Sequence, residues 1–115
     1  MPLALMTFTG GLAREVLEEA GWDTLDGDHP HRGSGANARA IDLWIFGIAA
    51  DRFAERVQML AALKIQAPNL RMVVIAPFLR DSAGHCLSDI LLDVPVIRSG
   101  FERELLLDAV AAAIL

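Results

Sequence analysis

Five short apolar runs alternate along this chain with segments of helical periodicity, and this alternation restricts its fold more than any other feature. Nearly continuous apolar runs are typical of strands that are covered on both faces. The expected strands are 3–8, 22–25, 42–48, 72–76 and 94–98. The expected helices are 12–20, 36–40, 51–67, 81–92 and 101–115. Because parallel neighbours need long crossover connections, five such units predict a doubly wound α/β sheet with helices on both faces.

The length of the chain narrows this architecture further. With 115 residues, we expect one domain over 1–115 and no second. At this size the flavodoxin-like (βα)5 arrangement, with strand order 2-1-3-4-5, is the expected one. Ligands bind such sheets at the carboxyl ends of the strands. Function is therefore expected at residues 7–11, 47–50, 76–81 and 98–101.

Composition excludes several classes of protein. The net charge is −5 and the pI is about 5.0, which argues against a nucleic-acid surface. The longest stretch without a charged residue, 1–13, is shorter than a membrane-spanning helix needs, and no basic segment precedes it as in a signal peptide. A single cysteine, Cys86, excludes an intramolecular disulfide and a multi-cysteine zinc site. We therefore expect a cytoplasmic domain that binds neither nucleic acid nor membrane.

Several fragments, in their order and spacing, resemble a response-regulator receiver domain of two-component signalling. Residues 17–22 (Leu-Glu-Glu-Ala-Gly-Trp) resemble the end of a receiver's first helix. Residues 42–48 (Asp-Leu-Trp-Ile-Phe-Gly-Ile) resemble its central strand, and 101–105 (Phe-Glu-Arg-Glu-Leu) resemble the opening of its last helix. The resemblance covers nearly the whole chain and implies the same flavodoxin-like fold.

The residues that receiver chemistry requires are missing. The phospho-acceptor position at the end of the third strand falls on Gly47, which has no nucleophile. No Asp or Glu precedes Glu15, so the acidic pair that would hold Mg²⁺ is absent. The expected hydroxyl falls on Ala76 and the expected lysine on Ser99, while the nearest carboxylate, Asp51, lies four residues beyond Gly47. The resemblance therefore implies a pseudo-receiver that is not an enzyme and needs no cofactor.

The end of the last expected helix is apolar on every side, since 109–115 contains no polar residue. A helix that packs on one face of a sheet should keep a polar face. Receiver-like domains often dimerise through this part of the fold. The resemblance thus implies an interaction surface for a histidine kinase, another regulator or a second copy of the chain, formed by Phe101, Leu105, Ala112 and Leu115.

Two alternatives remain open. Arg80 and Arg98 follow the fourth and fifth strands, where they could hold an anion. Some receiver-related domains bind small effectors, so a nucleotide such as cyclic di-GMP could occupy the vacated pocket beside Gly47. The other alternative is a small flavodoxin-like enzyme or FMN carrier, for which the chain offers only Thr7 and Thr9 in the first turn and no tyrosine.

Three further groups are interpreted as structural. Gly10-Gly11 lacks the spacing of a dinucleotide-binding fingerprint and is interpreted as a turn. His85-Cys86 would lie adjacent on the helix 81–92, where neighbours do not face each other, so they are not expected to form a nucleophile and base. A loop with metal-ligating residue types is interpreted as a solvated loop rather than a metal site; these residues are Asp26, Asp28, His29 and His31.

Overall fold

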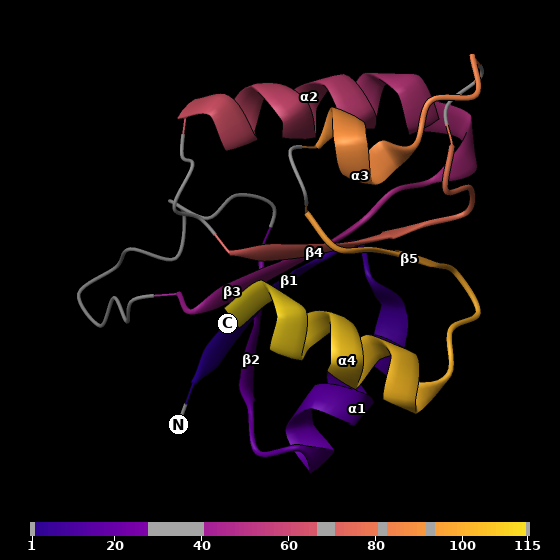
Figure 1. Cartoon of the computed structure of the whole chain (residues 1–115). Helices are drawn as coiled ribbons and strands as arrows, with labels where there is room; N and C mark the ends of the chain where they lie inside the picture. Colours follow the sequence, from indigo (N-terminus) through magenta and orange to yellow (C-terminus); the bar gives the residue numbers. More distant parts are fainter. Residues whose placement is uncertain (1, 28–40, 67–70, 81–82, 92–93, 115) are drawn as a thin grey trace.

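The computed structural model describes residues 2–27, 41–66, 71–80, 83–91 and 94–114 (Figure 1). Five strands form one parallel sheet in the order β2-β1-β3-β4-β5, which confirms the predicted flavodoxin-like topology. The strands are β1 Leu3–Thr7, β2 Asp23–Asp26, β3 Leu43–Gly47, β4 Met72–Ala76 and β5 Val96–Arg98.

The sheet register brings the strand ends to one edge. Thr7 at the end of β1 lies opposite Phe46 of β3, and Gly47 at the end of β3 lies opposite Ile75 of β4. Ala76 at the end of β4 lies opposite Arg98 of β5. We call this side of the sheet, where β1, β3, β4 and β5 end, the carboxyl edge.

Helices cover both faces of the sheet (Figure 1). α1 (Gly10–Glu19) and α4 (Arg103–Ile114) pack on one face, against side chains such as Met6 and Ile45. α2 (Phe53–Gln66), which follows a short 3-10 helix η1 (Ala50–Arg52), packs with α3 (Leu87–Ile90) on the other, against Trp44 and Phe46. Every residue of β1, β3 and β4 is buried, because alternate side chains enter the two cores. None of the helices in the described ranges is long and apolar enough to cross a membrane.

The helix predicted over 81–92 is largely wrong. Within its described part only Leu87–Ile90 is helical. Gly84 has a φ of +87° and Cys86 is extended, and Cys86 forms an isolated antiparallel bridge with Arg80. The Leu87 N–H then donates to the Leu79 carbonyl oxygen at 2.9 Å. Because of these backbone contacts, the described residues just before Leu87 (83–86) do not form a helix.

The remaining expectations differ at the ends of elements. The helix predicted over 36–40 lies outside the described residues. The first strand ends at Thr7 rather than at Phe8, whose φ of +56° is incompatible with a strand. The last strand begins at Val96, although the preceding Val94 is also buried.

Candidate functional site

A hollow of about 250 Å³ opens at the carboxyl edge, at the place where the sequence predicts function. The turn after β1, the end of β3 and the turn between β5 and α4 all contribute to it. Its walls are mostly apolar or backbone, and its lining residues are Phe8, Thr9, Gly11, Leu12, Gly47, Ile48, Ile75, Ser99, Gly100 and Phe101.

The turn after β1 passes directly over Gly47, the position that the resemblance assigns to the phospho-acceptor. A Cβ atom built on Gly47 would lie 2.0 Å from the Phe8 carbonyl oxygen and 2.8 Å from its carbonyl carbon. Both atoms belong to the backbone, so they cannot move aside as the end of a flexible side chain could. Only glycine fits this position with the turn as it stands.

The Phe8 side chain points away from the core and forms a cluster with Phe46 and Arg56. Phe8 is 64% exposed, and its ring meets the buried Phe46 ring edge-to-face, with 6.0 Å between centroids. The Arg56 guanidinium carbon of α2 lies 4.9 Å from the Phe8 ring centroid and 6.0 Å from that of Phe46. This is cation–π geometry. The sequence does not predict this cluster, because its apolar pattern places Phe8 in a buried strand and nothing local links residue 8 to residue 56.

The other receiver positions contain no ionisable group. Ala76 is fully buried, and its carbonyl oxygen accepts a 2.8 Å hydrogen bond from the Ser99 N–H. Gly100 has a φ of +83°, which turns the chain from β5 toward α4. Asp51 is exposed in the first turn of η1 and does not line the hollow. The arrangement at the carboxyl edge can therefore bind apolar groups but offers no carboxylate for phosphotransfer or Mg²⁺ in the residues lining it.

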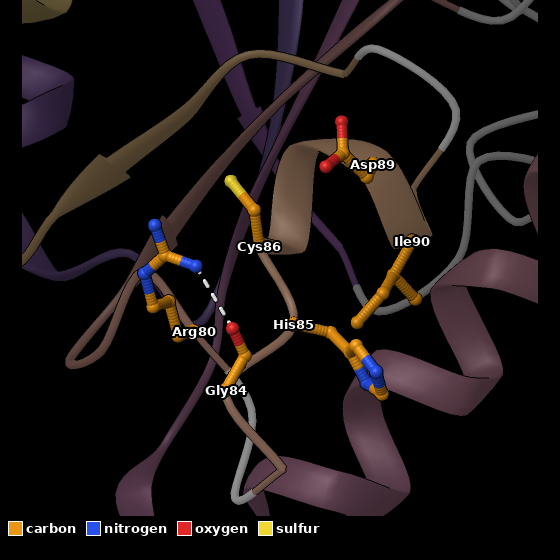
Figure 2. A pocket seen from close by; sticks show the side chains of 6 residues that line it. All are labelled: Arg80, Gly84, His85, Cys86, Asp89 and Ile90. Carbon is orange, nitrogen blue, oxygen red and sulfur yellow. Dashed lines mark hydrogen bonds between the residues drawn. The ribbon is translucent and has the colours of Figure 1, made fainter.

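Arg80 and Arg98, the predicted anion ligands, lie outside this hollow. Arg98 is exposed at the end of β5. Arg80 lines a separate open hollow of about 640 Å³ beside α3, where its guanidinium donates to the Gly84 carbonyl oxygen at 2.8 Å (Figure 2). Figure 2 also shows His85 and Cys86 in this hollow with their side chains pointing apart. They are not adjacent on a helix as predicted, yet they do not face each other.

A third hollow, of about 320 Å³, lies at the N-terminus of α1 and is lined partly by Gly11. Two of its walls are Arg14 and Asp26, whose side chains form an ion pair. An anion at this helix terminus would compete with the Asp26 carboxylate for Arg14. The hollow thus gives no support to a phosphate site beside Gly10-Gly11.

The loop with metal-ligating residue types falls mostly outside the described residues, which include only Asp26 of its four candidates. Across the parts of the chain that the structure describes, no three His, Cys, Asp or Glu side chains form a group that could hold a metal ion.

The predicted interaction surface on the last helix is partly exposed. Leu105 is 47% exposed and Ala112 is exposed, whereas Phe101 is half-buried and packs against the core under α1 and α4. Leu115 lies outside the described residues. Ile114, which belongs to the apolar end 109–115 but not to the four residues predicted to form the surface, is 36% exposed.

Comparison with solved structures identifies the fold. No protein-family model matches the chain, and no curated protein sequence matches it. A CheY-like response regulator receiver domain protein from Methanospirillum hungatei JF-1 superposes with a TM-score of 0.69 at 12% identity, covering 99% of this chain and 94% of that one. The chain has the fold of a response-regulator receiver domain.

Two further structures share this receiver fold. A response regulator from Thermotoga maritima superposes with a TM-score of 0.70 at 17% identity, and the match covers 99% of this chain and 98% of that chain. A putative pilus assembly-related protein from Burkholderia pseudomallei K96243 gives a TM-score of 0.69 at 21% identity, covering 99% and 90%. The receiver fold places the hollow beside Gly47 at the edge where the resemblance puts the phosphorylation site.

Proposed function

We propose that this chain is a pseudo-receiver: a regulatory module of two-component-type signalling that binds another protein and carries no aspartyl phosphate. The observation that carries the proposal is the contact between Gly47 and the Phe8 peptide. An acceptor carboxylate at position 47 would begin with a Cβ atom 2.0 Å from the Phe8 carbonyl oxygen. The peptide of Phe8 occupies the space that such a side chain needs.

The absence of a metal-binding acidic pair supports the same proposal. Phosphoryl transfer to a carboxylate needs a cation that neutralises charge on the transferring group. The turn after β1 supplies Phe8 and Thr9 at the carboxyl edge, and no Asp or Glu precedes Glu15 in the sequence. Phosphotransfer would thus lack its nucleophile and its metal ligands together. The module is therefore proposed to be non-enzymatic and to need no cofactor.

Binding of a partner is supported by the outer surface of α4. Leu105, Ala111, Ala112 and Ile114 are exposed on this helix. Leu105 and Ala112, seven residues apart, lie on the same side of the helix, and apolar side chains exposed on one side of a helix are a common feature of interfaces. The partners that we propose are a histidine kinase, another regulator or a second copy of the chain, and the proposed location is the cytoplasm.

The test is a reaction with a small-molecule phosphodonor. The purified chain is incubated with acetyl phosphate and Mg²⁺, and its intact mass is measured, with a phosphorylatable receiver as the positive control. We expect the mass to stay unchanged. A gain of one phosphoryl group would overturn the proposal, and its loss in Asp51→Asn would identify Asp51 as a replacement acceptor.

The nucleotide-sensor alternative stays a prediction. Its two arginines do not line the hollow beside Gly47, and Arg80 uses part of its donor capacity on the Gly84 carbonyl.

A further inference from the structure

We propose that the carboxyl edge is a second binding surface, which accepts an acidic segment of a partner protein carrying one bulky apolar side chain. The surface consists of Phe8, Leu12, Arg56 and the hollow beside Gly47. The inference rests on the proposed function in one respect, namely that the chain acts by binding another protein. It does not depend on the α4 surface.

The first observation is the conformation of Phe8. Its φ of +56° is the only positive value for a non-glycine residue in the described parts of the chain. A bulky residue in this left-handed region costs free energy that other interactions must offset. Burial of the ring does not offset it, since 64% of the residue is exposed. The turn therefore exposes a large aromatic ring to solvent at a conformational cost. Strained residues of this kind are common at binding sites.

The second observation is the placement of Arg56. Its guanidinium lies over the Phe8 ring at 4.9 Å, and no described carboxylate forms an ion pair with it. A stacked guanidinium keeps its N–H donors at the edge of its plane, where they fit a carboxylate in bidentate geometry. Aromatic and arginine side chains are also the residue types that dominate binding energy in interfaces.

The third observation is the hollow that Phe8 also lines. Leu12 is 53% exposed at its rim and Phe101 is half-buried in its wall. Its volume of about 250 Å³ is below the ~300–1,000 Å³ that is typical of sites for drug-sized ligands. The lining offers apolar side chains, backbone and two hydroxyl-bearing residues, Thr9 and Ser99, but no charged group. It fits one apolar side chain better than a nucleotide or a flavin.

These observations specify the chemistry of the occupant. The apolar hollow takes a side chain such as leucine or phenylalanine, while Arg56 takes a carboxylate a residue or two away. Arg98, exposed at the end of β5 next to the Ser99 wall, adds positive charge at the same edge. Neither Arg56 nor Arg98 has an ion-pair partner among the described residues, so both guanidinium groups can take a carboxylate, which favours an acidic segment over a basic one.

The test is a selection from a random peptide display library against the whole chain, followed by affinity measurements on the enriched peptides. We expect enriched sequences to place Asp or Glu beside a bulky apolar residue. Arg56→Gln should weaken their binding about tenfold or more. Phe8→Asn, which tolerates the left-handed backbone, should do the same. The matched control is Arg71→Gln, which removes an exposed arginine just before β4 at the opposite edge and should leave affinity unchanged.

Other outcomes overturn the inference. Basic or uncharged consensus peptides, no enriched peptide, or affinity indifferent to Arg56→Gln would each do so. Peptides that depend on Leu105 and Ala112 alone would overturn it while supporting the proposed function through α4. A self-association that Arg56→Gln abolishes would show that the occupant is a second copy instead. Phosphorylation by acetyl phosphate would refute the proposed function. The binding surface at the carboxyl edge would still be supported or overturned by the peptide result alone.

Discussion

The indole Nε1–H of Trp44 donates a 2.9 Å hydrogen bond to the Thr7 hydroxyl inside the core between the sheet and α2. Trp44 is 1% exposed and Thr7 is also 1% exposed, so water cannot take over either role. The Thr7 hydroxyl in turn donates to the Gly27 carbonyl oxygen just after β2. One buried side chain thus connects three neighbouring strands of the sheet.

Thr7→Val should destabilise the protein by about 1–3 kcal/mol, because the shape is kept while the buried indole loses its acceptor. The measurement is the free energy of unfolding in urea. Thr7→Ser is the matched control and should retain most of the stability, since it keeps the hydroxyl. A Val variant as stable as the Ser variant would contradict the role assigned to this bond.

Gly47→Ala should destabilise the chain by more than about 3 kcal/mol, at or beyond the upper end of ordinary overpacking in a core. The added methyl group would lie 2.0 Å from the Phe8 carbonyl oxygen. Gly11→Ala is the control, because a Cβ there meets nothing within 4 Å and Gly11 lies in α1. It should change stability little or raise it by up to about 1 kcal/mol. Equal effects of the two changes would disprove the close approach over Gly47.

Ala112→Glu should weaken self-association if a second copy binds to α4, because a charge would then enter an apolar contact. Sedimentation velocity at several concentrations measures the effect. Ala54→Glu places the same charge at an exposed position of α2 and should leave the sedimentation profile unchanged. An unchanged profile for Ala112→Glu would count against this surface in a homodimer.

A thermal-shift screen against cyclic dinucleotides, common nucleotides and phosphate mimics should leave the Tm unchanged. An effector at ~100 times its Kd would add about 2.7 kcal/mol. In a domain of this size each kcal/mol raises the Tm by roughly 4–8 °C. A clear rise that Arg80→Ala reduces would instead favour the nucleotide-sensor alternative.

The strands could be predicted well because a strand that is buried on both faces is a continuous apolar run in the sequence. Met72–Ala76 is apolar at every position, and its predicted bounds are those observed. The start of α3, predicted at residue 81, could not be predicted correctly, because it depends on contacts that do not appear in the local apolar pattern. Leu87 and Ile90 fit a helical period from residue 81 onward, yet Gly84 has a positive φ and Cys86, which pairs with Arg80, is extended, so the helix begins only at Leu87.

In the candidate site, too, the features that depend on local sequence could be predicted, and those that depend on long-range contacts could not. That Gly47 lies at the end of the third strand could be predicted from apolar periodicity and from the resemblance. That the Phe8 peptide covers it could not, since this contact joins residues far apart in the chain and depends on one backbone angle. Nothing in the sequence distinguishes Arg56 from the other polar residues of the helix to which it belongs. Only the fold brings its guanidinium to the Phe8 ring.

The close approach over Gly47 also limits how this chain can evolve. An aspartate side chain at position 47 would collide with the Phe8 peptide, which belongs to the turn after another strand. A carboxylate at position 47 therefore requires a different turn after β1 as well as the substitution itself. The neighbouring backbone, and not only the residue type at position 47, thus keeps a carboxylate away from the end of β3.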